Sequence, residues 1–289
     1  MHVGLATTAA ARGLDEDHAP LAAAFAGLGH TAAAPEWEDP AVDWGAFGLV
    51  LLRSTWNYTE DLPRFLAWAD SVAAVAPLYN PIPVLRWSTD KRYLLDLERA
   101  GVPIVPSAIT APGEAWSAPA AEEYVIKPAV GAGSRGARRF LASEVDEARR
   151  HAARLHEEGY HALTQPYLHS VDDHGETALM IFEGEFSHAI RKGPLLRRGG
   201  GEVAGLFAAE TIDPRVPGAD ELDVAMRAVA AIPGAAPLYA RVDLIRDPAG
   251  QPCVLELELA EPSLFFNYAP GSAANLARRA LARLAGGRR

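Results

Sequence analysis

Cysteine and long apolar runs are the scarcest features of this 289-residue sequence. The one cysteine, Cys253, cannot form a disulfide within the chain, and the strand-like stretch around it favours a buried position. No window approaches the roughly 20 apolar residues that a membrane-spanning helix needs. The N-terminus lacks a basic start and a sustained apolar segment, so no signal peptide is expected. These absences predict a cytoplasmic protein.

A surplus of positive charge is also missing, because the formal net charge is -10 at pH 7. This balance argues against a nucleic acid or an anionic membrane as partner, although a local basic cleft can still bind phosphates. The length allows two or three lobes with their own cores. The oligomeric state is left open, with a homodimer or a tetramer as the candidates.

Strand-like and helix-like patterns alternate over the first 80 residues, which is typical of a parallel α/β sheet. Apolar runs predict strands at 2–7 and 48–54, and helices are expected at 19–29 and 62–75. Three prolines within 77–87 break regular structure and favour a linker.

The rest of the chain predicts two α+β lobes. Ser88 can cap a helix that ends at Gly101. Two later apolar runs look like a hairpin turned at Glu183 and Gly184. The expected fold class is therefore α/β and α+β. The expected domains are a parallel α/β lobe at 1–85, a central lobe at 86–168, and a lobe of antiparallel strands at 169–289, with a glycine-rich break at 199–201.

Two apolar runs near the C-terminus carry paired charges, Arg241 with Asp243 and Glu256 with Glu258. Residues two apart on a β-strand project from the same face, so adjacent strands would aim three carboxylates and a guanidinium into one pocket. Such crowding is costly unless cations lie between the acids, and magnesium with nucleotide phosphates would supply that compensation. The alternative is that these residues form solvated outer faces of half-exposed strands.

A lysine at the end of a strand, Lys127, precedes three glycines within residues 131–136. Glycines let the backbone wrap around phosphate oxygens, and the lysine adds a positive charge. The order of residues does not fit a Walker A loop, and a strand rather than a helix is expected at 138–140. What remains is a hairpin flap over phosphates, with Ser134 and Arg135 as further donors, or else a flexible surface turn.

The ordered set of features resembles the ATP-grasp superfamily, particularly its glutathione-synthetase-like branch, over residues 48 to 268. It consists of "STDKRYLL" around Lys91, Lys127 before its flap, "TQPYL" at 164–168, and the two acidic strands. The resemblance implies an ATP-grasp fold, with ATP held between two α+β lobes and with magnesium as the metal.

The resemblance also assigns roles to single residues. Lys91 and Lys127 would lie on the α- and β-phosphates, beside the flap residues Ser134, Arg135 and Gly136. The adenine would contact Gln165, Tyr167 and Leu168, and the ribose an acid at Asp173 or Glu176. Magnesium would be bound by Asp243, Glu256 and Glu258, with Arg241 on the transferred phosphoryl group. The third metal position is usually asparagine in this superfamily, so Glu258 is a departure that alters the charge balance.

Three further groups of residues are candidates for substrate contacts. One lies at the end of an apolar strand and comprises Arg53, Ser54, Thr55 and Asn57, where Arg53 could bind a carboxylate; a packed strand-end loop is the alternative. Arg191 and Lys192 end a hairpin and would contact phosphate or substrate, or else be solvated. Glu261 and Ser263 follow the acidic strands and are expected near the reactive centre.

The residues point to phosphoryl transfer, because charge neutralisation and positioning matter more there than a protein nucleophile. No "GxSxG" motif occurs in the sequence. A substrate carboxylate that attacks ATP gives an acyl phosphate, which an amine displaces, so a ligase forming a C–N bond is expected. "RSTWNY" and "ELELAEPSLFF" resemble the cyclo-ligase subgroup of the superfamily, in which an amino acid such as O-ureido-D-serine closes a ring on itself. An intermolecular amide ligase, a kinase-like transferase and a non-catalytic nucleotide-binding module are the alternatives.

Overall fold

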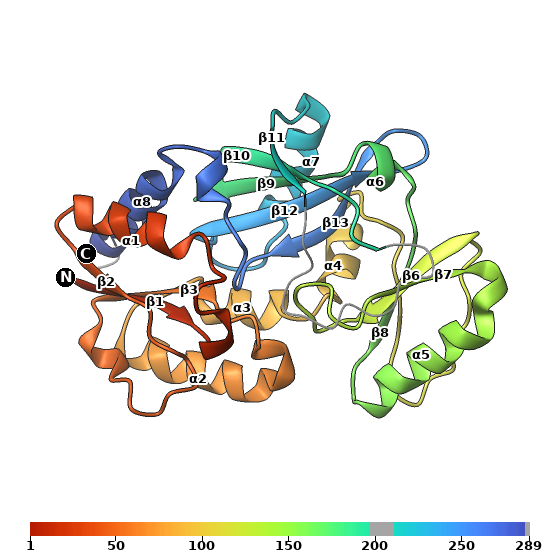
Figure 1. Ribbon diagram of the computed structural model, residues 1–289, viewed down its shortest axis with the longest axis horizontal. Coiled ribbons are helices and arrows are strands. Elements are labelled where there is room, and N and C mark those ends of the chain that lie inside the picture. The colour runs from red at the N-terminus through yellow and green to blue at the C-terminus, as the bar shows by residue number, and fades with distance from the viewer. Residues whose placement is uncertain (197–210, 287–289) are drawn as a thin grey trace.

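The computed structural model describes residues 1–196 and 211–286, which form three sheets with helices packed against them (Figure 1). The expected glycine-rich break at 199–201 lies outside the described residues. Within the described part of the chain, no helix is long and apolar enough to cross a bilayer.

The N-terminal sheet is parallel, as predicted, with the strand order β2-β1-β3-β4. Its strands are β1 (His2–Thr7), β2 (Thr31–Ala33), β3 (Leu49–Ser54) and β4 (Leu78–Tyr79). Helix α2 (Leu62–Val75) covers one face, while α1 (His18–Gly27) and the C-terminal α8 (Ser272–Gly286) cover the other. Because both faces are covered, every residue of β3 is buried.

The expectation of a linker at 77–87 is wrong, because this segment forms β4 and helix α3 (Ile82–Ser88). Proline is tolerated in the first turn of a helix, where the backbone amides have no partner within the helix. Ser88 is accordingly the last residue of α3 and not a cap. The next helix is α4 (Tyr93–Arg99), and the chain leaves it at Gly101, whose φ is +78°, as predicted.

The central sheet is antiparallel, with the order β5-β8-β6-β7. Its strands are β5 (Ala108–Thr110), β6 (Glu123–Pro128), β7 (Arg138–Leu141) and β8 (Ala162–Pro166). Helix α5 (Val145–Glu157) packs on it through an apolar cluster that includes Tyr124, Phe140 and Leu155. The strand predicted at 138–140 is thus confirmed.

The C-terminal sheet is also antiparallel, with the order β11-β10-β9-β12-β13. Its strands are β9 (Glu176–Phe182), β10 (Glu185–Lys192), β11 (Ile212–Arg215), β12 (Tyr239–Arg246) and β13 (Pro252–Glu258). The helices α6 (Ser170–Asp173) and α7 (Ala219–Ala230) accompany it, and α4 packs into the same core as α7. The predicted hairpin is confirmed, because Glu183 and Gly184 turn it with positive φ angles.

Short 3-10 turns complete the described structure: η1 (Ala9–Ala11), η2 (Trp44–Ala46), η3 (Tyr58–Glu60), η4 (Ala142–Glu144) and η5 (Phe266–Tyr268). One apolar core joins the N-terminal and C-terminal sheets, because Leu5 and Leu49 share a cluster with Met180, Phe182 and Leu276. The boundaries expected at 85 and 168 stay a prediction.

Candidate active site

A cavity of about 500 Å³ lies where the central and C-terminal sheets face each other, with loops of the N-terminal lobe at one end. Its lining includes most of the predicted site residues, namely Lys91, Lys127, Ser134, Arg135, Gln165, Tyr167, Leu168, Glu176, Lys192, Arg241, Asp243, Glu256, Glu258, Glu261 and Ser263. Residues separated by more than 160 positions therefore converge on one space.

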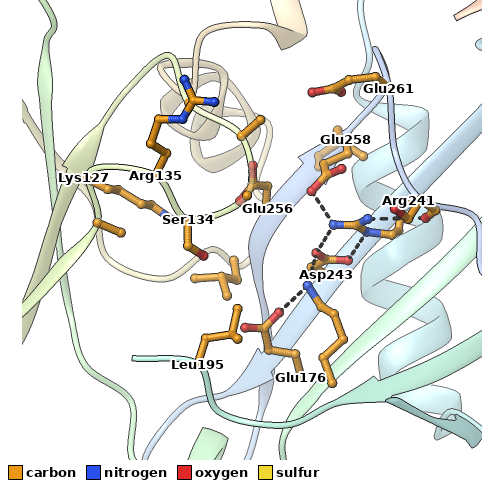
Figure 2. Close-up of a pocket in the computed structure, with 18 of the residues that line it drawn as sticks. Lys127, Ser134, Arg135, Glu176, Leu195, Arg241, Asp243, Glu256, Glu258 and Glu261 are labelled. Atoms are coloured by element: carbon orange, nitrogen blue, oxygen red, sulfur yellow. Dashed lines mark hydrogen bonds and ion pairs between the residues drawn. The ribbon is translucent and has the colours of Figure 1, made fainter. Parts of the chain in front are cut away.

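The paired charges of β12 and β13 face each other across the two strands, as predicted. In the antiparallel register, Arg241 lies opposite Glu258 and Asp243 lies opposite Glu256. The Arg241 guanidinium donates to both Asp243 oxygens at 2.9 Å and also to Glu258 (Figure 2). Asp243 is only 2% exposed, which excludes the alternative of a solvated outer face.

Lys192 lies among these acids, with its Nζ 2.8 Å from both Asp243 Oδ2 and Glu176 Oε2. Its neighbour Arg191 points elsewhere and donates to the backbone oxygens of Asp173 and His174. Neither Arg191 nor Asp173 lines the cavity, so of the two candidate ribose acids only Glu176 does.

Burial and neighbouring charges separate the pKa values of the acids. Burial works to raise the pKa of Asp243, but Arg241 and Lys192 outweigh it and hold that pKa at about 2. Burial also opposes ionisation of Glu256, yet Lys91 and Lys127 keep its pKa below the usual value. For Glu258, burial together with repulsion from Glu256 and Asp243 raises the pKa to about 8 despite Arg241.

Two lysines face Glu256 from the other side. Lys91 Nζ lies 3.0 Å from Glu256 Oε1 and donates to the backbone oxygen of Gly131 at 2.5 Å. Burial lowers the pKa of Lys127, and Lys91 and Lys192 lower it further, although Glu256 and Glu176 partly oppose them. Its side chain extends into the cavity towards Ser134 (Figure 2). A lysine in such surroundings is well placed to gain an anionic partner.

The glycine-rich stretch forms a flap over this part of the cavity. Gly133, Ser134 and Gly136 all have positive φ angles, which bend the backbone into a tight arch. Gly136 lies behind the lining, where a Cβ atom would come within 3.1 Å of the Pro128 side chain. At the tip, Arg135 Nη1 lies 2.7 Å from Glu60 Oε1 of the N-terminal lobe.

The far end of the cavity is apolar and includes part of the segment predicted to contact adenine. Val125, Leu168, Val171, Ile245 and Leu255 line it. A residue absent from the sequence-based predictions supports this end: Arg139 stacks 3.3 Å from the centroid of the Tyr167 ring and forms a buried ion pair with Glu123. The Tyr167 amide in turn donates to the Glu123 backbone oxygen at 2.9 Å.

The substrate residues expected at the end of β3 and just after it lie outside the cavity lining. Arg53 pairs with Asp17, and the Ser54 hydroxyl lies 2.7 Å from the Thr7 hydroxyl. Thr55 is completely buried, and Asn57 hydrogen bonds to Trp37 and Glu38. Their neighbours in sequence line the cavity instead, together with segments that sequence analysis did not single out: Leu14–Asp17, Trp56, Tyr58, Phe265, Asn267 and Tyr268.

Comparison with known proteins agrees with this architecture. Residues 3–80 match the family model described as the N-terminal domain of D-cycloserine synthetase DcsG. The chain is 40% identical over 301 residues to the cycloserine biosynthesis protein DcsG of Streptomyces lavendulae, with 98% of each covered. The crystal structure of D-cycloserine synthetase DcsG superposes with a TM-score of 0.92 at 38% identity, covering 98% of this chain and 100% of that one.

A more distant similarity shows the wider fold. The ATP-grasp ligase PsnB, solved with its minimal precursor, Mg and ADP, has a TM-score of 0.63 at 18% identity, covering 98% of this chain and 97% of that one. Fold and site together define an ATP-grasp ligase. Within that class, the chain belongs to the family of the D-cycloserine synthetase DcsG.

Proposed function

We propose that this ligase uses ATP and magnesium to activate an amino-acid carboxylate, on which a nitrogen of the same molecule then closes a ring. The observation that carries the proposal is the convergence of Lys91, Lys127, Arg241, Asp243 and Glu256 on one cavity. The family relationship supports ring closure, because the relative is named for the biosynthesis of cycloserine.

The shape and charge of the cavity fit a nucleotide. The apolar end near Tyr167 would receive the adenine, with Gln165 and Leu168 beside it, and Glu176 would reach the ribose. The basic middle, closed by the flap, would receive the phosphates through Lys91, Lys127, Ser134 and Arg135. Gly136 would contribute by permitting the close backbone arch.

The acids fit magnesium only together with nucleotide oxygens. Among the described residues, no three acidic, histidine or cysteine side chains are arranged so that they could hold a metal ion by themselves. Asp243, Glu256 and Glu258 are each turned towards a basic side chain. Magnesium is commonly bound by one or two carboxylates plus phosphate oxygens, so the nucleotide would complete the set of ligands to which Asp243, Glu256 and Glu258 contribute. The bound ion would neutralise charge that develops on the phosphates.

The chemistry requires two displacements. A carboxylate oxygen of the substrate attacks the terminal phosphorus, and the bond to the bridging oxygen of ADP breaks. The nitrogen of the same substrate attacks the acyl carbon, loses a proton and expels phosphate. Arg241, which is anchored by Asp243 and by the Ser263 backbone oxygen, would steady the phosphoryl group in both steps.

The proposal is tested by incubating the purified protein with magnesium, ATP and O-ureido-D-serine. ADP release and a ring-closed product detected by mass spectrometry are expected. Lys127→Ala and Glu256→Ala should lower the rate by orders of magnitude, whereas the exposed Glu157→Gln should not change it. Near-normal turnover in both alanine variants would contradict the proposal, and amide formation only with an added amine would show an intermolecular ligase. A cytoplasmic location, where ATP is available, belongs to the same proposal.

A further inference from the structure

The charges that line the cavity differ between its middle and the end next to the N-terminal lobe. Its basic lining residues are Lys91, Lys127, Arg135, Lys192 and Arg241. None of them comes from the segments 14–17, 56–58 or 260–268, whose lining residues surround the end next to the N-terminal lobe. That end is instead acidic and aromatic, with Glu16, Trp56, Tyr58, Glu261 and Phe265 among its lining. Acidic and aromatic side chains together favour a cationic ligand group.

Glu261 is the acid of this end that is both buried and without a basic partner. Only 5% of the residue is exposed, yet its side chain reaches into the pocket beside Glu258 (Figure 2). Across the described ranges 1–196 and 211–286, its carboxylate accepts a hydrogen bond from its own backbone amide, and no hydrogen bond or ion pair from another residue reaches it. Asp17 differs, because its carboxylate forms an ion pair with Arg53 and accepts hydrogen bonds from three backbone amides.

The backbone around Glu261 is held firmly in place. Its own carbonyl oxygen accepts from Trp56 Nε1 at 3.2 Å, and the next, Pro262, accepts from Arg53 at 3.0 Å. The Ser263 oxygen accepts from Arg241 at 3.3 Å, and the Leu264 oxygen lies 2.7 Å from a ring nitrogen of His188. A backbone fixed in this way holds the Cα atom of Glu261 at the edge of the cavity, which reduces the movement needed to bind a ligand.

We infer that Glu261 binds the protonated α-amino group of the substrate and thereby selects α-amino acids over other carboxylic acids. The inference rests on the proposed function, because it requires the reacting carboxylate to lie near Arg241. The ammonium would then project towards Glu261, on the side of Glu258 that faces the N-terminal lobe. Burial and repulsion from Glu256 raise the pKa of Glu261 to about 7 in the ligand-free protein, although Lys91 and Arg241 act in the opposite direction, and a bound ammonium would relieve that cost.

The test uses two ligands that differ only in the α-amino group, namely O-ureido-D-serine and 3-(carbamoylaminooxy)propanoic acid. Their binding is measured by calorimetry with magnesium and a non-hydrolysable ATP analogue. The wild type should prefer the amino ligand by roughly 10- to 100-fold, as expected for a hydrogen bond between charged groups. Glu261→Gln should abolish that preference, because it lowers the affinity for the amino ligand and leaves the affinity for the other ligand unchanged.

Two further variants serve as controls for the effect of charge at position 261. Glu261→Asp retains the charge on a shorter side chain and should retain part of the preference. Glu157→Gln removes a charge at the exposed end of α5 and should leave the preference intact. The melting temperature and the affinity for the ATP analogue show whether each variant is folded.

Several results would overturn the inference. One is an unchanged preference in Glu261→Gln, and another is an equal loss of affinity for both ligands in that variant. A change only in the magnesium requirement, or no binding of either ligand to the wild type, would also contradict it. ADP release by the wild type is measured separately. A wild type that shows the preference but releases no ADP would contradict the proposed function and leave the role of Glu261 standing.

Discussion

Arg53 Nη2 lies 3.2 Å from Asp17 Oδ2, and the two side chains are 1% and 4% exposed. The Asp17 carboxylate also accepts from the backbone amides of 264–266, and Arg53 donates to the Pro262 oxygen. The pair therefore fastens the loop that carries Glu261 to the end of β3. Arg53 is a positioning residue in this arrangement and not the direct carboxylate ligand expected from the sequence.

Removing one member of this pair should strongly destabilise the protein. Asp17→Asn leaves the Arg53 guanidinium buried without its counter-charge, which typically costs about 3–5 kcal/mol. Urea unfolding measures the change in the free energy of unfolding. Asp70→Asn, which breaks the exposed pair with Arg86, is the matched control and should cost less than about 1 kcal/mol. Similar losses in the free energy of unfolding of the two variants would show that the buried pair stabilises the protein no more than the exposed pair does.

The raised pKa of Glu258 predicts how stability depends on pH in the protein without metal and nucleotide. An acid whose pKa is about 8 when folded and about 4.5 when unfolded holds more protons in the folded state between these values. Stability should therefore fall as the pH rises from about 5 to 8. Glu258→Gln should flatten this slope and be more stable than the wild type at pH 8.

Thermal unfolding of both proteins at several pH values checks this dependence. Glu261, whose pKa is raised to about 7, contributes a slope of the same sign, so some dependence should remain in Glu258→Gln. Saturating magnesium and ATP should reduce the difference between the two proteins, because cations near the acids lower the cost of ionisation. A wild-type stability that rises from pH 5 to 8 would refute the prediction.

The acidic strands could be predicted because the relevant pattern is local. Arg241 and Asp243 alternate with apolar residues, and so do Glu256 and Glu258, so the shared face follows from strand geometry alone. The flap could be predicted for the same reason, from three glycines after a strand that ends in Lys127.

The parts that could not be predicted depend on distant contacts. Both faces of β3 are buried, so its sequence does not reveal that Arg53 turns towards Asp17 and away from the cavity. The isolation of Glu261 depends on segments that lie more than 200 residues earlier in the chain. The prolines of 77–87 led to the wrong prediction of a linker, because the effect of a proline depends on where a helix begins. Helix α3 begins directly after Pro81.

The contact between the flap and the N-terminal lobe should affect ATP binding more than stability. Arg135 and Glu60 are partly exposed, and such pairs contribute about 0–1 kcal/mol. Glu60→Gln should change the unfolding free energy little but raise the KM for ATP several-fold at low salt, because the flap loses an anchor. In 0.5 M salt the difference from the wild type should shrink. Steady-state kinetics at both salt concentrations gives the KM for ATP of the two proteins. An unchanged KM at low salt would show that the contact does not hold the flap.

Close backbone approach at the base of the flap predicts a large effect of one added methyl group. Gly136 has a φ of +71°, and a Cβ there would lie 3.1 Å from Pro128 Cδ, so Gly136→Ala must strain the turn and displace the flap. The affinity for ATP, measured by calorimetry, should fall at least tenfold. Gly159→Ala is the control, since Gly159 also has a positive φ of +86° but has nothing within 4 Å of the added atom. It should lose about 1 kcal/mol of stability and bind ATP normally. Equal ATP affinity in the two variants would show that the arch at Gly136 does not shape the phosphate site.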